Sequence, residues 1–306
     1  MRILITGATG FIGRALVPRL QRDGHTVIVW ARSPERARAL LGADVDIVSS
    51  GAPFETLVAT LEGCDAVVNL AGEPLMAGRW TPARRRAIEE SRLQLTATRV
   101  RAIAAASPRP RVLVSGSAVG FYGDRGDERL TESSGGSDDF LARLCDAWER
   151  AASDAEAHGV RVVRLRIGVV LGREGGALAR MLPPFALGIG GPIGSGRQFM
   201  PWIHLHDLVR VVAAALVDDR YAGAINGVAP EEATSRTFAK ALGRALRRPA
   251  VLPVPAFMLR ALLGRMADEI MLSGPRVLPA QAMEAGFTFR YPTLDAALTR
   301  ILGPHA

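Results

Sequence analysis

The chain has 306 residues, of which 48% are apolar and 22% are charged, enough apolar surface to exclude a disordered protein. The length predicts one large domain or two of ordinary size. No apolar run reaches the roughly 18 residues that a membrane helix needs, so we expect no membrane partner. With two cysteines and a strand pattern that begins at Arg2, without a signal peptide before it, we expect a cytoplasmic protein.

The net charge of +8 arises from 38 basic and 30 acidic residues, and Lys240 is the only lysine. The arginines are spread along the chain, and the one dense run, Arg84-Arg85-Arg86, is expected to be a solvated helix face. Because nucleic-acid proteins cluster basic residues with aromatic residues between them, we expect no nucleic-acid partner. The positive net charge favours binding of an anionic ligand through long-range attraction.

The first thirty residues predict a strand, a glycine-rich turn, a helix and a second strand. The strand Arg2–Thr6 runs into Gly7, Ala8, Thr9, Gly10, Phe11, Ile12 and Gly13, and a second strand is expected over His25–Trp30. Glycines at a strand-to-helix turn permit unusual dihedrals and a close approach of the backbone to a pyrophosphate. The helix N-terminus then faces the phosphates with its N–H groups and its positive dipole end. This turn therefore predicts a dinucleotide site.

The end of the second strand predicts which dinucleotide binds. Enzymes that bind NAD place Asp or Glu near this point for the ribose 2′-hydroxyl, whereas this chain has Arg32 and Ser33. A guanidinium and a hydroxyl would bind a 2′-phosphate, which a carboxylate would repel. The sequence therefore favours NADP(H). The alternative is that Arg32 only begins the exposed helix Pro34–Leu41.

Strand and helix patterns continue to alternate along the chain. Further strands are expected over 44–48, 65–70, 111–114 and 160–170, and helices over 54–61, 82–106 and 138–158. Six strands separated by helices predict an α/β fold with a doubly wound parallel sheet, which binds ligands beyond the carboxyl ends of its strands. This nucleotide-binding domain is expected over 1–172, completed by about 202–230. Segments 173–201 and 231–306, with helices around 234–247, 255–263 and 293–302, would form a substrate-side part.

Several motifs together resemble the extended short-chain dehydrogenase/reductase family with its Rossmann-type fold. These motifs are the glycine turn, Asn69-Leu70-Ala71-Gly72, the serine-rich stretch from Ser115 to Gly123, Leu165-Arg166-Ile167-Gly168, and Trp202-Ile203-His204. The segment Leu144-Cys145-Asp-Ala-Trp148-Glu149 and a small C-terminal domain are similar to an atypical "epimerase family" branch. The resemblance implies that Asn69, Leu70, Ala71, Gly72, Ser115 and Ile167 border the cofactor.

The chain departs from the family at its catalytic pair. The wider family uses a serine or threonine together with Tyr-x-x-x-Lys, but alignment through Glu149 places Leu141 and Cys145 at those two positions. Leu141 cannot move a proton, and a thiol with a pKa near ~8.5 is mostly protonated. Binding of the dinucleotide is unaffected by this difference. The source of a catalytic proton is therefore open.

Three residues are candidates for catalysis. Ser117 matches the family serine and could polarise a carbonyl, or it could bond only to its own turn. Tyr122 could act as a replacement acid, or it could pack beside the cofactor. His204 titrates near working pH, yet with His206 and Asp207 it could simply join the chain to the sheet by local hydrogen bonds. These last three residues lack the spacing of a metal site, and none is expected.

The leading hypothesis is an NADP(H)-dependent oxidoreductase or epimerase acting on a small carbonyl or hydroxyl compound. Apolar residues near 185–202 suggest a partly apolar substrate, although core packing explains them equally well. The missing Tyr-x-x-x-Lys motivates an alternative, a non-catalytic NADP(H)-binding redox sensor or partner-binding module. The long helices over 82–106 and 138–158 could pair two copies, so a homodimer is also an expectation.

Overall fold

The computed structural model describes residues 1–303 and contains a seven-stranded parallel sheet. Its strands in chain order are β1 (Arg2–Thr6), β2 (Thr26–Ala31), β3 (Asp46–Ser49), β4 (Ala66–Asn69), β5 (Val112–Ala118), β7 (Arg161–Ile167) and β10 (Gly223–Gly227). Their spatial order is β10-β7-β5-β4-β1-β2-β3, with every neighbouring pair parallel. The chain crosses over at β1, so the carboxyl ends of β1 and β4 border the crevice where such sheets bind ligands. The predicted fold class is confirmed.

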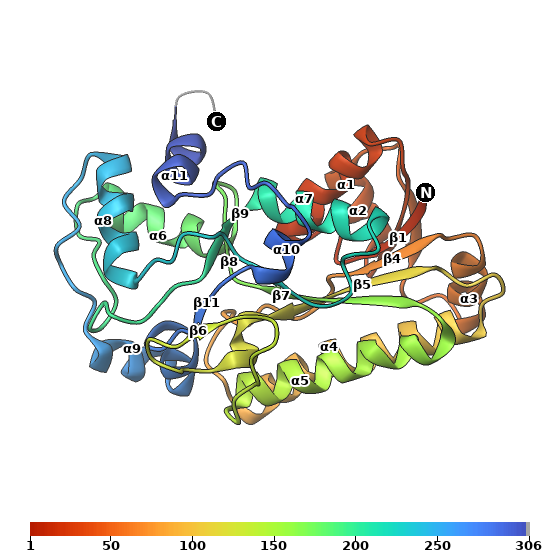
Figure 1. Cartoon of the computed structure of the whole chain (residues 1–306), viewed down its shortest axis with the longest axis horizontal. Helices are drawn as coiled ribbons and strands as arrows, with labels where there is room; N and C mark the ends of the chain where they lie inside the picture. Colours follow the sequence, from red (N-terminus) through yellow and green to blue (C-terminus); the bar gives the residue numbers. More distant parts are fainter. Residues whose placement is uncertain (304–306) are drawn as a thin grey trace.

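Helices cover both faces of this sheet (Figure 1). They are α1 (Phe11–Arg22), α2 (Pro34–Leu41) and α7 (Leu205–Val217) on one face, and α3 (Phe54–Glu62), α4 (Pro82–Ala105) and α5 (Phe140–Ser153) on the other. Alternate side chains of the strands enter the two cores: Ile3 and Ile5 of β1 face α1 and α7, and Leu4 faces α3 and α4. Burial on both faces explains why β1 is apolar at every inner position.

A third core lies beyond the sheet, in the C-terminal part of the chain. It joins the two-stranded sheet of β8 (Val169–Leu171) and β9 (Trp202–His204) to helices α6 (Gly176–Ala186), α8 (Ser235–Leu246) and α11 (Leu294–Leu302). The remaining strands and α-helices in residues 1–303 are β6 (Arg129–Leu130), which pairs with β11 (Arg276–Val277), and the helices α9 (Ala256–Leu263) and α10 (Ala280–Glu284). The last residues of the predicted substrate-side part, 304–306, lie outside the described residues. No helix within residues 1–303 is long and apolar enough to cross a membrane.

Two expectations about the strands are wrong. The single strand predicted over 160–170 is two strands, β7 and β8, in different sheets, because the chain turns away at Gly168. A Cβ at that residue would lie 2.6 Å from the carbonyl oxygen of Pro201, so only glycine permits the crossing. The prediction also lacked β10, whose Gly-Ala-Ile-Asn-Gly sequence has weak strand propensity and is held by pairing with β7.

Candidate active site

The glycine turn leads from β1 directly into α1. Gly7 has a φ of +73°, and a Cβ there would lie 2.6 Å from the carbonyl group of Leu70, the residue that follows β4. The N–H of Gly10 donates to the carbonyl oxygen of Gly7 at 3.0 Å. At Gly13 a Cβ would lie 2.5 Å from that same oxygen and from the Cα of Ala8, so the glycine lets α1 approach β1. The unusual dihedrals expected in the turn are found at Gly7, and the close helix packing is found at Gly13. The close approach of this backbone to a pyrophosphate stays a prediction.

The start of α1 is suited to an anion. Phe11 begins the helix, and Gly10, which precedes it, has no side chain that could cap the first turn. The N–H groups of the first turn, around Phe11, Ile12 and Gly13, therefore lack a capping side chain and carry the positive end of the helix dipole. Thr9 is half-buried in the same turn. A diphosphate placed here would receive both the hydrogen bonds and the field of the helix.

The strand ends beside the turn are tied together by buried polar groups. Thr6 Oγ1 donates to Asn69 Oδ1 at 2.7 Å, and Asn69 Nδ2 donates to Thr96 Oγ1 at 2.9 Å and to Ser115 Oγ at 3.5 Å. The side chains of Asn69 and Ser115 are thus used within the protein. A cofactor would meet the backbone of Leu70, Ala71 and Gly72, and the half-buried Ile167 at the end of β7.

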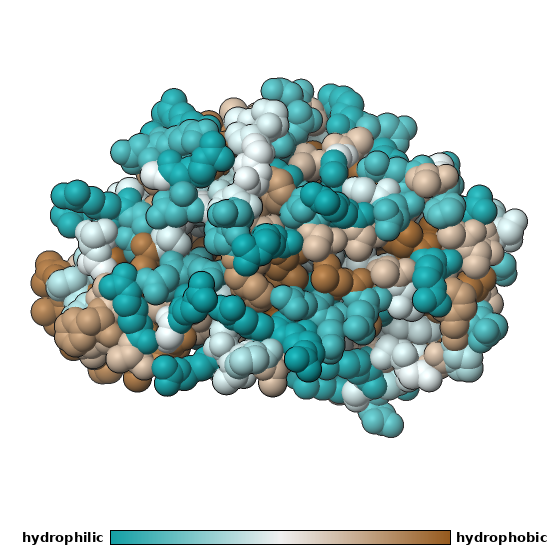
Figure 2. Space-filling view, turned by 90° about the horizontal axis from the view of Figure 1, so that it is seen from below, coloured by the Kyte–Doolittle hydropathy of each residue, from teal (hydrophilic) through white to brown (hydrophobic). Residues whose placement is uncertain are grey.

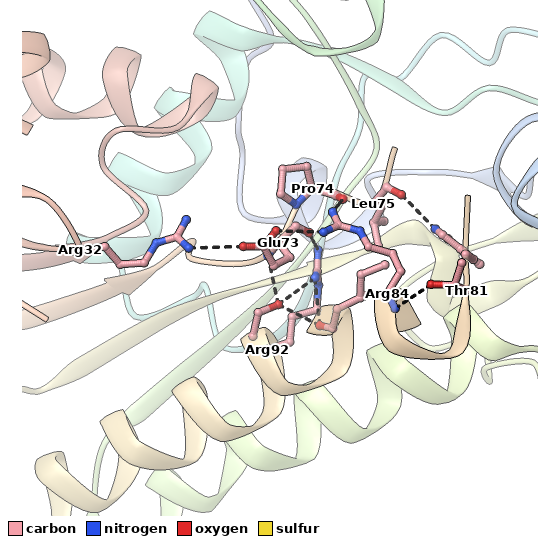
Figure 3. A network of polar contacts seen from close by, with 10 residues as sticks. Arg32, Glu73, Pro74, Leu75, Thr81, Arg84 and Arg92 are labelled. Carbon is pink, nitrogen blue, oxygen red and sulfur yellow. Dashed lines mark hydrogen bonds and ion pairs between the residues drawn. The ribbon is translucent and has the colours of Figure 1, made fainter. Parts of the chain in front are cut away.

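Arg32 follows β2 and faces the chain that leaves β4. Its Nη1 lies 3.3 Å from Glu73 Oε1, and its side chain is 87% exposed (Figure 3). Ser33 caps α2 by accepting the N–H of Arg36 at 3.4 Å. Arg32 is thus available at the position where a 2′-phosphate is expected, but its present partner is the carboxylate of Glu73, a residue that the sequence analysis did not single out.

Glu73 connects Arg32 to helix α4. Its second carboxylate oxygen lies 3.2 Å from Arg84 Nη1, its N–H donates to Ser91 Oγ at 3.0 Å, and its carbonyl accepts Arg92 Nη2 at 3.1 Å. Figure 3 shows Arg32 reaching Glu73 from one side and Arg84 reaching it from the other. The expectation of a solvated face at Arg84-Arg85-Arg86 is therefore wrong for the first two residues. Arg84 holds Glu73, and Arg85 lies over the rings of Trp80 and Phe140.

Ser117 belongs to a buried ion-pair network. Its hydroxyl donates to Glu149 Oε1 at 2.7 Å, and Arg166 donates to both oxygens of the same carboxylate at 2.8 Å. Ser117, Glu149 and Arg166 are each at most 5% exposed. Because the hydroxyl hydrogen is directed to Glu149, Ser117 can offer a ligand only an accepting lone pair. Polarising a carbonyl, as the sequence suggested, would require this hydrogen bond to break.

Tyr122 ends the same network. Its hydroxyl accepts Arg166 Nη1 at 2.9 Å and donates to Asn226 Oδ1 at 2.8 Å, and the side chain is fully buried. Burial raises the pKa of Tyr122, although Arg166 and Asn226 oppose the shift. Both hydrogen-bonding roles of the hydroxyl are thus satisfied within the protein. This geometry does not favour Tyr122 as a proton donor to a substrate, and the prediction of such a role stays untested.

The positions of the family's tyrosine and lysine are occupied by non-ionised groups. Leu141 packs with Phe140, Leu144 and Ile88 in a small apolar cluster. Cys145 is buried next to Ser117, and burial raises the pKa of its thiol to about 12. A neutral thiol cannot supply the positive charge of a lysine. The structure therefore places no group that is charged near neutral pH at either position of the family's Tyr-x-x-x-Lys pair.

His204 caps a helix. Its Nδ1 accepts the N–H of His206 at 3.0 Å at the start of α7, and its ring lies 4.0 Å from the ring of Tyr291. Burial lowers the pKa of His204 to about 4. Asp207 accepts the N–H groups of Arg290 and Tyr291 at 2.9 and 2.8 Å. The contact between His204 and His206 is local, as the sequence alternative expected, whereas Asp207 binds residues that are 83 and 84 positions away. A catalytic role of His204 stays a prediction.

The sequence analysis did not assign a role to two groups that bind the predicted site residues: the Glu149–Arg166 pair, which binds Ser117 and Tyr122, and Glu73, which binds Arg32. Glu149 and Arg166 both lie within motifs that carry the family resemblance, but a pattern does not reveal that they pair across 17 residues. Glu73 has no local signal. Within residues 1–303, no three His, Cys, Asp or Glu side chains gather as a possible metal site.

Comparison with protein families gives two matches. The model of the NAD dependent epimerase/dehydratase family matches residues 3–226, and a domain of unknown function, DUF1731, matches residues 254–301. Among curated proteins, the chain is 43% identical over 307 residues to the chloroplastic SDR39U1 homolog of Arabidopsis thaliana, covering 99% of this chain and 87% of that protein. It is 40% identical over 305 residues to human SDR39U1, covering 99% and 100% of the two chains.

Solved structures agree with these matches. The crystal structure of human epimerase family protein SDR39U1, isoform 2, with NADPH superimposes with a TM-score of 0.89 at 39% identity, covering 99% of each chain. The UDP-N-acetylglucosamine 4-epimerase of Bacillus cereus superimposes with a TM-score of 0.77 at 20% identity, over 98% of each chain. The second likeness concerns the fold alone.

Proposed function

Because the chain belongs to the NAD dependent epimerase/dehydratase family, with the extended short-chain dehydrogenase/reductase architecture, we propose that it binds NADP(H) at the glycine turn. We further propose that it acts as an oxidoreductase or epimerase on a small, partly apolar carbonyl or hydroxyl compound. The single observation that carries the proposal is the uncapped start of α1 beside an exposed arginine at the end of β2. The human relative at 39% identity was solved with NADPH, which supports the same cofactor here.

The chain's own residues suit distinct parts of this cofactor. The first-turn N–H groups of α1 would hold the diphosphate, and the glycines at 7 and 13 keep the backbone close enough to do so. Arg32 would bind the 2′-phosphate with two N–H donors, in exchange for its contact with Glu73. A bound nicotinamide supplies hydride transfer. Ser117 lies at the carboxyl end of β5, where its oxygen could accept a substrate hydroxyl while its own hydrogen stays on Glu149.

One observation favours a second function. Ser117 and Tyr122 are both hydrogen-bonded within the protein, and Leu141 and Cys145 leave the family's proton-transfer position without an ionisable group near neutral pH. A protein of this kind could bind NADP(H) without turning it over. As a redox sensor or partner-binding module, it would change its affinity for a partner with the NADPH/NADP⁺ ratio.

Calorimetric titration of NADPH and NADH into wild-type protein and Arg32→Asp tests the cofactor assignment. We expect NADPH to bind more tightly than NADH, and the substitution to weaken NADPH by at least tenfold while changing NADH by less than threefold. Equal weakening of both would overturn the assignment. Arg38→Asp, an exposed arginine in α2, is the matched control.

Turnover distinguishes the two functions. NADPH oxidation and NADP⁺ reduction are measured over panels of carbonyl and hydroxyl compounds, with epimerisation followed by NMR. Turnover of any compound, lost together with NADPH binding in Arg32→Asp, supports the enzyme. No turnover with NADPH binding retained supports the sensor, provided that partner affinity changes with the cofactor ratio.

A further inference from the structure

Large apolar side chains are exposed mainly in the C-terminal part of the molecule. Leu187 is 75% exposed, Val251 74% and Phe257 72%, and Ile189, Leu252, Met258 and Leu262 are also exposed. Figure 2 shows hydrophobic residues gathered at the left end of the molecule, the end where α9 lies in Figure 1. Clusters of this kind on a protein surface mark an interaction site, because single exposed apolar residues are common but large groups of them are not.

These residues lie on two segments that run side by side. The N–H of Gly194 donates to the carbonyl oxygen of Val254, and the N–H of Val254 donates to that of Pro192, both at 2.9 Å. A Cβ on Gly191 would collide with the backbone of Leu252. Segment 187–194 is therefore fixed against segment 249–256, and α9 continues directly from the latter. The seven apolar side chains consequently belong to one continuous part of the fold, here called the apolar rim.

A basic cavity of about 890 Å³ adjoins the apolar rim. Val251 and Pro253 line it together with five cationic side chains: Arg236, Lys240, Arg244, Arg247 and Arg248. The first three recur every fourth residue along α8, so they share one helix face. Like charges at this spacing repel each other, so the face is not optimised for stability of the helix.

Few of these cations are neutralised within the protein. Arg244 pairs with Asp295 at 2.8 Å, and Arg236 donates to the carbonyl oxygen of Ser195. Over residues 1–303, no carboxylate forms an ion pair with the other four cationic side chains of the cavity. Four of the five cations therefore have no carboxylate partner within residues 1–303, and they lie close to the exposed apolar side chains of the rim.

We propose that the basic cavity and the apolar rim form a docking surface for an anionic phospholipid bilayer. Lipid phosphates would enter the cavity, and the side chains of the rim would enter the acyl boundary just below the headgroups. A nucleic acid would neutralise the cations but leave Leu187, Val251 and Leu262 in water. A bilayer satisfies both features at once.

The sequence predicted no membrane partner, because it contains no segment that could span a bilayer. A peripheral surface depends instead on which side chains are exposed, and apolar residues at 251–262 are equally compatible with a core. The proposal is independent of the cofactor, since none of these residues borders the glycine turn.

Vesicle co-sedimentation tests the surface. We expect wild-type protein to bind vesicles of phosphatidylglycerol and phosphatidylcholine at least tenfold better than vesicles of phosphatidylcholine alone, and binding to weaken with added salt. Phe257→Ser with Leu262→Ser, and separately Arg247→Glu with Arg248→Glu, should each reduce binding at least fivefold. Val217→Ser and Arg109→Glu are the matched controls, since both replace exposed residues elsewhere. An unchanged urea unfolding transition shows that each variant is folded.

The single lysine provides a second measurement on the unmodified chain. An amine-reactive label can modify only Lys240 and the N-terminal amine, which lies beside His25 on the nucleotide-binding part. Anionic vesicles should reduce labelling of Lys240 severalfold and leave the N-terminus unchanged, as read by mass spectrometry. If inorganic phosphate alone at millimolar concentration gave the same protection and vesicles bound no protein, the cavity would be a site for a free anion and the proposal would be wrong.

Three other results would also overturn it: equal binding to neutral and anionic vesicles, undiminished binding in both double variants, or no binding to either vesicle. Sedimentation equilibrium tests whether a second copy of the chain binds to this surface instead. If the Phe257 and Leu262 substitutions abolish a dimer while vesicles bind no protein, the apolar rim joins two copies of the chain instead.

Discussion

Arg32 and Glu73 face each other across the expected position of the adenosine ribose, with Nη1 of the arginine 3.3 Å from Oε1 of the glutamate. The arginine comes from the end of β2 and the glutamate from the chain that leaves β4 (Figure 3). A carboxylate thus occupies the partner position that a 2′-phosphate would take. If Arg32 binds the 2′-phosphate as proposed, the two anions would compete for one guanidinium.

Replacing Glu73 by Gln should tighten NADPH binding. The substitution removes both the competitor for Arg32 and a negative charge near the phosphate, while the amide keeps the shape of the side chain. An exposed ion pair is worth up to about 1 kcal/mol, so we expect a gain of about threefold to fivefold for NADPH by calorimetry and less than twofold for NADH. Glu62→Gln, at an exposed position in α3, is the control. Weaker NADPH binding would instead mean that Glu73 orients Arg32.

Gly13→Ala should abolish NADPH binding and destabilise the protein. The new Cβ would lie 2.5 Å from the Gly7 carbonyl oxygen, so α1 must move away from the turn and its N–H groups move with it. Overpacking of this kind costs about 1–3 kcal/mol, which urea unfolding measures. Gly135→Ala, where a Cβ meets open space, should change neither property. A Gly13→Ala variant that kept wild-type affinity would contradict the assignment of the turn.

Arg166→Leu should be strongly destabilising. It removes two hydrogen bonds from the buried Glu149 carboxylate and one from Tyr122, which leaves an unpaired buried charge. Such losses cost about 3–5 kcal/mol. Arg150→Leu, which breaks an exposed ion pair with Asp146 on α5, should cost less than about 1 kcal/mol. The double variant Arg166→Leu, Glu149→Leu should recover part of the lost stability. If Arg166→Leu cost no more stability than the control Arg150→Leu, the buried network would be contradicted.

His204 should contribute to acid sensitivity. Its folded-state pKa is about 4, against about 6.5 in an unfolded chain, so between these pH values the unfolded state binds more protons at this residue. The free energy of unfolding therefore falls as the pH falls from 7 to 4, by about 3 kcal/mol from this group. His204→Asn keeps a cap acceptor but does not titrate, so its stability should fall less over that range. Urea unfolding at both pH values measures the difference.

The exposed His158 provides the control for that measurement. His158→Asn should lose as much stability on acidification as the wild-type protein. If His204→Asn behaved in the same way, burial of the His204 ring would not be the source of the pH dependence.

The nucleotide-binding half could be predicted from the sequence because its signals are local. A buried strand, a glycine turn and a helix follow one another within the first 22 residues, and each is encoded by apolar periodicity or by a backbone conformation that only glycine adopts readily. Gly7 and Gly13 have the geometry that their spacing indicated. The sequence likewise identified the absence of the Tyr-x-x-x-Lys pair, since that is a statement about which residues are present.

Only the tertiary structure decided which groups pair. Tyr122 bonds Asn226 across 104 residues, and Arg32 meets Glu73 across 41, separations at which no local pattern specifies a contact. The hydroxyl of Tyr122, the candidate acid, is therefore hydrogen-bonded within the protein. Arg32, the candidate ligand of the 2′-phosphate, already has a carboxylate partner in Glu73. The apolar rim also could not be predicted from the sequence. Hydropathy identifies the apolar side chains, but only the packing of the folded chain determines which of them are buried and which are exposed.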